Sequence, residues 1–239
     1  MSRAPSPSHP LTKAQARSIW LDAQRLTAPA PFGAGSDATR AAIEHLGYVQ
    51  IDTINVIERS HHHILWSRIP AYRREDLRQA QSVDKSVFEY WTHALSYVPT
   101  RDLRFFLPAM RRHRREGHRW LSTVTSADMR KVMRLIRKGG GLTIRDIEDD
   151  VLTEKEHLWQ SRKPSKRALQ LAFYGGVVTI SERAGMLKTY ELMHRHFGWD
   201  KPPKPAPACA TPVMDGMKVA TRSEKALKFQ RSVMEFLLI

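Results

Sequence analysis

Residues 165–192 have the sequence SKRALQLAFYGGVVTISERAGMLKTYEL, and this stretch decides the fold class. Residues 165–174 are predicted to form a helix, which the following pair of glycines ends. Residues 177–181 and 187–192 contain β-branched and aromatic side chains, and they are predicted to pair as a hairpin that turns at Gly185. The stretch therefore combines a helix with a two-stranded hairpin.

Two further helical segments are predicted just before this stretch. Apolar residues at positions 129, 132, 133 and 136 follow the spacing of an amphipathic helix, and the glycines at 139–141 end it. Residues 142–147 are predicted to form a short second helix with Thr143 as its cap. Three helices followed by a hairpin are typical of a winged helix, a helix-turn-helix variant that places one helix in the major groove of DNA. A helical bundle with a stray hairpin is the alternative.

The rest of the chain repeats this pattern less clearly. Helices are predicted at residues 13–26, 37–46, 54–68, 73–80 and 101–115, and β-structure at 48–52, 87–91 and 94–98. The predicted fold class is mainly α with small β-hairpins (α+β), built from tandem winged-helix (helix-turn-helix) units. The predicted parts are a disordered N-terminus (1–10), three units (11–72, 73–122 and 123–200), and a Pro-rich linker with a divergent tail (201–239) that contains one helix (223–238).

The charge balance predicts a polyanionic partner. The 239 residues include 39 lysines and arginines against 24 acidic residues, which gives a net charge of +15. Phosphate backbones are the commonest polyanion for such a chain, because each neutralised phosphate releases counterions. A charged solubility surface and an anionic membrane surface are the alternatives. No apolar run is long enough for a membrane span or a signal peptide, and the single cysteine, Cys209, excludes an internal disulfide and a cysteine-based zinc site.

Gln50-Ile51-Asp52 is the first candidate for chemistry. In a strand, residues 50 and 52 point to one face and Ile51 to the other, so an amide and a carboxylate lie side by side over an apolar anchor. A carboxylate can deprotonate water or stabilise a developing cation, and an amide can orient that water. The alternative is that Asp52 caps a helix starting near Thr53 and that Gln50 is a plain surface residue.

Histidines and arginines give further candidates. The histidines at 61–63 are predicted not to share a metal, because consecutive helical residues point about 100° apart. His93 lies between aromatics, and a buried, hydrogen-bonded histidine is the alternative to a site role. Residues 101–119 are the densest basic stretch, which predicts phosphate contact, with a solvated helix face as the alternative. No phosphate-binding glycine loop or Ser/His/Asp pattern is present, so no nucleotide cofactor is expected.

Several of these segments resemble one known family. Residues 49–60 (VQIDTINVIERS), 65–68 (LWSR), 89–94 (EYWTHA), 163–169 (KPSKRAL) and the hairpin at 177–190 resemble the YcaQ-like family of bacterial winged-helix DNA glycosylases. The resemblance extends over about residues 11 to 200. It implies an enzyme that removes N7-alkylated guanines and unhooks interstrand crosslinks, with a catalytic motif of Gln-x-Gln or, as here, Gln-x-Asp.

The resemblance assigns catalysis to Gln50 and Asp52. Active-site support is expected from Asn55, Arg59, Trp91 and His93, with no metal and no cofactor. The expected DNA contacts are Arg68, Arg101, Arg104, Arg111, Arg112, Arg114, Arg115, Lys166, Arg167, Arg183 and Lys188. The expected partner is damaged double-stranded DNA, bound by a monomer in the bacterial cytoplasm in association with the nucleoid.

The chain differs from the members of this family in its length. Its members are longer and continue into a C-terminal β-barrel, so the chain is expected to be a C-terminally truncated form. Two other functions remain open from the sequence: a non-catalytic winged-helix DNA-binding protein, such as a regulator or a decayed paralogue, and a general nucleoid-type binder.

Overall fold

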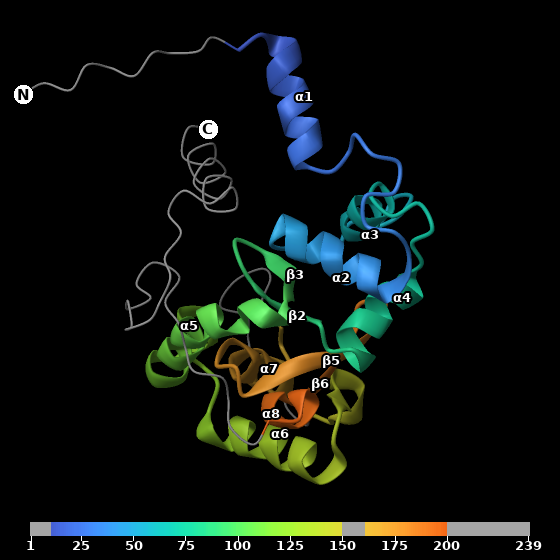
Figure 1. Cartoon of the computed structure of the whole chain (residues 1–239). Helices are drawn as coiled ribbons and strands as arrows, with labels where there is room; N and C mark the ends of the chain where they lie inside the picture. The colour runs from blue at the N-terminus through green and yellow to red at the C-terminus, as the bar shows by residue number, and fades with distance from the viewer. Residues whose placement is uncertain (1–10, 150–160, 200–239) are drawn as a thin grey trace, which may run out of the picture. The chain divides into compact units, whose positions relative to one another are not determined.

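The computed structural model describes residues 11–149 and 161–199, and these form helices around two small sheets (Figure 1). The helices are α1 (Lys13–Ala23), α2 (Gly35–Leu46), α3 (Ser60–Trp66), α4 (Arg74–Arg78), α5 (Leu103–Glu116), α6 (Ser126–Gly139), α7 (Pro164–Tyr174) and α8 (Met193–Phe197). The strands are β1 (Val49–Gln50), β2 (Val87–Trp91), β3 (Leu95–Pro99), β4 (Leu142–Thr143), β5 (Val178–Ala184) and β6 (Leu187–Leu192). A mainly α fold with small antiparallel hairpins is therefore confirmed, and the predicted parts 1–10 and 201–239, including the helix at 223–238, lie outside the described residues.

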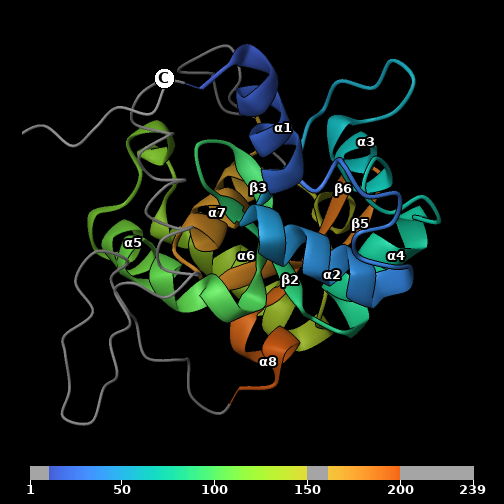
Figure 2. The ribbon, with the colours of Figure 1, turned by 45° about the horizontal axis from the view of Figure 1, so that its top comes forward.

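The first sheet has the strand order β1-β3-β2. Its strands are antiparallel, and Gln50 of β1 lies opposite Ser96 of β3. Helix α2 packs against β3 and α4, and it runs alongside this sheet in both views (Figures 1 and 2). Buried side chains such as Ile43, Leu65 and Tyr97 form the apolar core under it. The sheet thus joins two segments that lie far apart in the sequence.

The second sheet has the order β4-β6-β5 and carries the predicted hairpin. Helix α6 buries Val132, Met133 and Ile136, the apolar face that its spacing predicts, and packs against α7. Gly176, which follows α7, has a φ of +61°, and a Cβ there would lie 2.4 Å from the Met110 sulfur. The close turn from α7 into β5 therefore requires glycine.

The two cores differ in their extent along the chain. The buried residues of one core lie between positions 38 and 97, and those of the other lie between positions 88 and 193. The order α6-β4-α7-β5-β6 is compatible with a winged helix, but the assignment of winged-helix units and their division at residues 72 and 122 remain predictions. None of the helices within residues 11–149 and 161–199 is long and apolar enough to cross a bilayer.

The predicted helix at 54–68 is wrong over its first half. The helix begins only at Ser60, and residues 51–59 are irregular. Ile54 and Ile57, predicted to face the core, are 67% and 89% exposed. The Asp52 side chain accepts the backbone N–H of Ile54 at 2.9 Å, a local turn that competes with a helical start.

The short helix predicted at 142–147 is also corrected. Residues 142–143 form β4, which pairs with β6 at Thr189 and Tyr190. Only a 3-10 turn follows at Ile144–Asp146, although Thr143 caps it as expected. This strand of two residues depends on partners 46 and 48 residues away in the sequence, and local periodicity contains no sign of them.

Candidate active site on β1

Strand β1 places Gln50 and Asp52 on one face. The side chains of Val49 and Ile51 are buried, whereas those of Gln50 and Asp52 are half-buried, which is the alternation expected of a strand. Beyond β1, the N–H of Ile51 still donates to the carbonyl of Leu95 at 2.8 Å, so pairing with β3 holds the backbone up to the carboxylate. The amide and the carboxylate therefore lie side by side on a fixed backbone.

Asp52 does not cap a helix. Its Oδ1 accepts the N–H of Ile54, and no hydrogen bond to its Oδ2 is present within the described parts of the chain. The first contact orients the carboxylate, and the second oxygen can accept a proton from water or face a developing positive charge. The carboxylate is thus both positioned and accessible.

Gln50 is paired with His93. The Nε2 of His93 lies 3.1 Å from Oε1 of Gln50, and because an amide oxygen can only accept, the ring nitrogen donates. The His93 ring is exposed and contacts the edge of Tyr48, with 5.3 Å between the ring centroids. The alternative of a buried histidine is therefore wrong, and His93 fixes the orientation of the Gln50 amide.

A wide pocket of about 690 Å³ opens beside His93. Trp91 and Tyr174 form one wall, with their rings edge to face at 6.1 Å, and Tyr174 stacks on His118 at 4.5 Å. Arg112 also lines the pocket. Burial, with repulsion from His113 and Arg119, lowers the pKa of His118, which favours the neutral ring. The pocket offers stacking surfaces and a cation within one cavity that includes His93.

The structure does not bring Asn55 and Arg59 into this group. Asn55 is exposed in the irregular segment, and Arg59 lines a separate cavity of about 160 Å³ together with Ile51 and His61. Ile51 faces away from Gln50 along the strand, so the small cavity lies on the opposite side of β1. Of the four expected support residues, only His93 contacts Gln50, and Trp91 lines the same pocket as His93.

Helix α5 presents the predicted basic surface. Its buried face is Leu103, Leu107 and Met110, and its last turn is basic. The exposed arginines of α5 are Arg104, Arg111, Arg112, Arg114 and Arg115. Arg101, just before α5, is also exposed, but it is bound to Glu44 at 2.7 Å. The exposed face of α5 thus offers a row of cations suited to phosphates.

Three predicted DNA contacts point into the protein instead. Arg68 is 6% exposed and donates to backbone carbonyls of Gln24 and Ile64, which holds the chain after α1 against α3. Arg167 on α7 is 2% exposed. Arg183 on β5 is bound to Glu89 at 2.8 Å. We do not retain these three as DNA contacts, because a guanidinium committed to internal partners cannot also reach a phosphate.

The aromatic lining of the cavities was not predicted. Phe173, Tyr174 and Tyr190 come from the end of α7 and from β6, and their spacing is that of ordinary core residues. The cavities form only where these elements meet β2. No local signal in the sequence could have shown them.

Comparison with known proteins places the chain in a family. A family model described as DNA glycosylase AlkZ-like matches residues 43–224, which is most of the chain and includes Gln50, Asp52 and the hairpin. The match starts later and ends later than residues 11–200, the range suggested by the motifs. No solved structure matches the chain. The extent of the family match shows that this protein belongs to the AlkZ-like DNA glycosylase family.

Proposed function

We propose that the protein hydrolyses the N-glycosidic bond of N7-alkylguanine in double-stranded DNA and unhooks interstrand crosslinks made through that base. Membership of a DNA glycosylase family supports DNA as the substrate and glycosidic hydrolysis as the reaction. The observation that carries the proposal is the pairing of a positioned carboxylate, Asp52, with an amide, Gln50, that His93 orients.

The chemistry of the lesion suits these two groups. N7-alkylguanine already bears a positive charge, so it leaves without a strong general acid. The remaining demands are to stabilise an oxocarbenium-like sugar and to deliver water. Asp52 is proposed to supply the negative charge and accept the proton of the water, and Gln50 to position that water. His93 is proposed as a positioning residue that acts through Gln50.

An accessible site also suits a crosslinked substrate. A base that is covalently joined to the opposite strand cannot rotate fully out of the duplex. Gln50 and Asp52 are half-buried at a sheet edge, and Gln50 contacts His93, which lines the pocket, so they need not enclose the base. The exposed arginines of α5 are proposed to hold the phosphate backbone beside it.

The test is a single-turnover glycosylase assay on a duplex containing N7-methylguanine and on one with a nitrogen-mustard crosslink. Asp52→Asn keeps the shape and the contact with Ile54 but removes the charge, and it is expected to lower the rate by about 10²- to 10⁴-fold while DNA binding persists. His93→Ala is expected to reduce the rate less, and His93→Gln to restore part of it. Equal rates for wild type and Asp52→Asn would refute the catalytic assignment.

A further inference from the structure

A third cavity lies between α7 and the hairpin β5–β6, and neither Gln50 nor Asp52 lines it. It has a volume of about 710 Å³, in the range of small-molecule sites. Its walls combine aromatic rings with cations, and its described lining contains no carboxylate. The aromatic residues are Trp91, Phe173, Tyr174 and Tyr190, and the cations are Arg162, Lys166 and Lys188.

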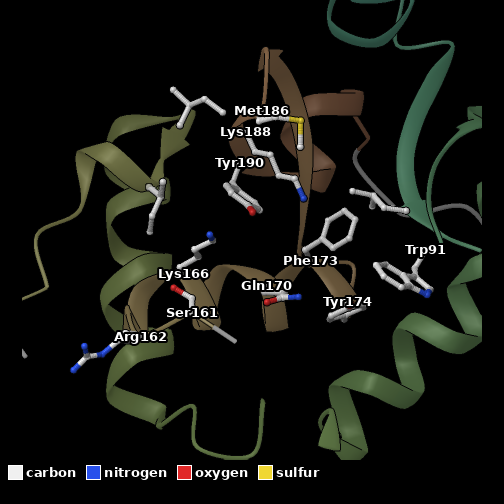
Figure 3. A pocket seen from close by; sticks show the side chains of 13 residues that line it. Trp91, Ser161, Arg162, Lys166, Gln170, Phe173, Tyr174, Met186, Lys188 and Tyr190 are labelled. Carbon is white, nitrogen blue, oxygen red and sulfur yellow. The ribbon is translucent and has the colours of Figure 1, made fainter. Parts of the chain in front are cut away.

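The lysines direct their charges into this cavity. In Figure 3 the ammonium groups of Lys166 and Lys188 and the hydroxyl of Tyr190 point toward its interior, and Trp91 and Tyr174 stand together at one side. Lys166 comes from α7 and Lys188 from β6, so two different elements converge on the same space. The geometry suits an anionic group held between the lysines, with a flat group beside the rings.

Lys188 is kept in an unfavourable environment for a cation. Its ammonium lies 5.8 Å from the centre of the Phe173 ring, and the nearby Glu89 carboxylate is already bound to Arg183. Desolvation, with further repulsion from Arg183 and Lys166, lowers the pKa of Lys188 to about 8. A cation without a carboxylate of its own gains most from an incoming anion.

We propose that this cavity binds one unstacked nucleotide of a DNA strand, with its base against the aromatic wall and its phosphate between Lys166 and Lys188. A phosphate alone would not need the aromatic rings, and an apolar ligand would not need the cations. A nucleotide satisfies both, since every base has a face that stacks on aromatic side chains. The inference rests on the DNA substrate of the family and not on the roles proposed for Gln50 and Asp52.

Trp91 and Tyr174 relate this cavity to the pocket of His93. Both residues line this cavity and also the pocket of His93, so one aromatic pair separates the two. A strand that contacts the His93 pocket can therefore place a neighbouring nucleotide on the other side of the pair. The protein would hold an unpaired nucleotide next to the reacting one.

The experiment compares two labelled duplexes that differ by one unpaired thymidine. Wild type is expected to bind the bulged duplex about tenfold tighter, because an unpaired base has already lost its pairing. Trp91→Ala is expected to remove this preference, since stacking contributes about a factor of ten or more. Lys166→Met is expected to reduce the slope of log affinity against log salt concentration by about 1, the value for one lost phosphate contact, and only for the bulged duplex.

Matched controls separate a local effect from a loss of charge or fold. Lys138→Met removes an exposed lysine from α6 and is expected to keep the preference for the bulge. Lys188→Met replaces a shielded ammonium by a thioether of similar length, so folding is retained while the preference falls. Equal binding of both duplexes by wild type, or a preference kept in Trp91→Ala and Lys166→Met, would overturn the proposal.

Two further measurements test whether the bound nucleotide belongs to a DNA strand and whether the cavity acts independently of the proposed catalytic pair. Free deoxyguanosine monophosphate is expected to bind far more weakly than the bulged duplex, and equal affinity would overturn the assignment to a DNA strand. Asp52→Asn is expected to keep the preference for the bulge. If wild type shows no glycosylase activity but still prefers the bulged duplex, only the catalytic proposal is refuted.

Discussion

Replacing Glu89 tests the internal ion pair that joins β2 to β5. The Glu89 side chain is fully buried and that of Arg183 is 7% exposed. Gln81 also donates to Glu89, at 3.0 Å. Glu89→Leu would leave the guanidinium of Arg183 buried without its carboxylate, and breaking such a pair is expected to lower the free energy of unfolding by about 3–5 kcal/mol. For a unit of this size, the expected drop in Tm is roughly 6–20 °C.

The double variant Glu89→Leu/Arg183→Met distinguishes a lost charge from lost packing. Both charges are then absent, so its stability is expected to return to within about 1 kcal/mol of wild type. Urea unfolding of wild type, the two single variants and the double variant gives the coupling energy directly. The reasoning fails if Glu89→Leu alone costs under about 1 kcal/mol, the value of a solvent-exposed pair.

Two other perturbations give separate measurable effects. Burial lowers the pKa of His61 to about 3, so between pH 6.5 and 3 the unfolded chain binds a proton that the folded chain does not, and stability falls as the pH falls. Wild type is expected to lose stability between pH 7 and pH 5, and His61→Phe is expected to remove about 2 kcal/mol of that loss. Urea unfolding at both pH values measures it, and an unchanged pH dependence of the free energy of unfolding would contradict the prediction. On α5, Arg111→Ala and Arg114→Ala are each expected to reduce the salt dependence of duplex binding by about one phosphate, measured by anisotropy titrations at several salt concentrations. The double variant Glu89→Leu/Arg183→Met is the control, because its stability is expected to be close to that of wild type, and it is expected to leave the salt dependence unchanged; a reduced slope there would show that Arg183 does contact DNA.

Elements whose evidence is local were predictable from the sequence. The periodic apolar positions of α6 are its buried face, and the run from α7 through Gly185 to β6 forms as its turn residues indicate. Features that depend on distant partners were not predictable. Strand β4 exists through its pairing with β6, and the aromatic cavities exist because α7 meets β2. Charge likewise did not reveal that Arg68 and Arg183 are needed inside the protein.

The error at residues 54–59 does not extend to the proposed catalytic pair. The placement of Gln50 and Asp52 depends on a two-residue period, and pairing with β3 at Ser96 and at Leu95 fixes that period whatever conformation residues 53–59 adopt. Asn55 and Arg59 were expected to support the site, but Asn55 is exposed in the irregular segment and Arg59 lines a separate cavity. The contact between the Asp52 carboxylate and the N–H of Ile54 competes with a helical start at residue 54, and it also orients Asp52 at the end of the strand. One local hydrogen bond therefore explains why the predicted helix is wrong over residues 54–59 and why the proposed catalytic pair is unaffected.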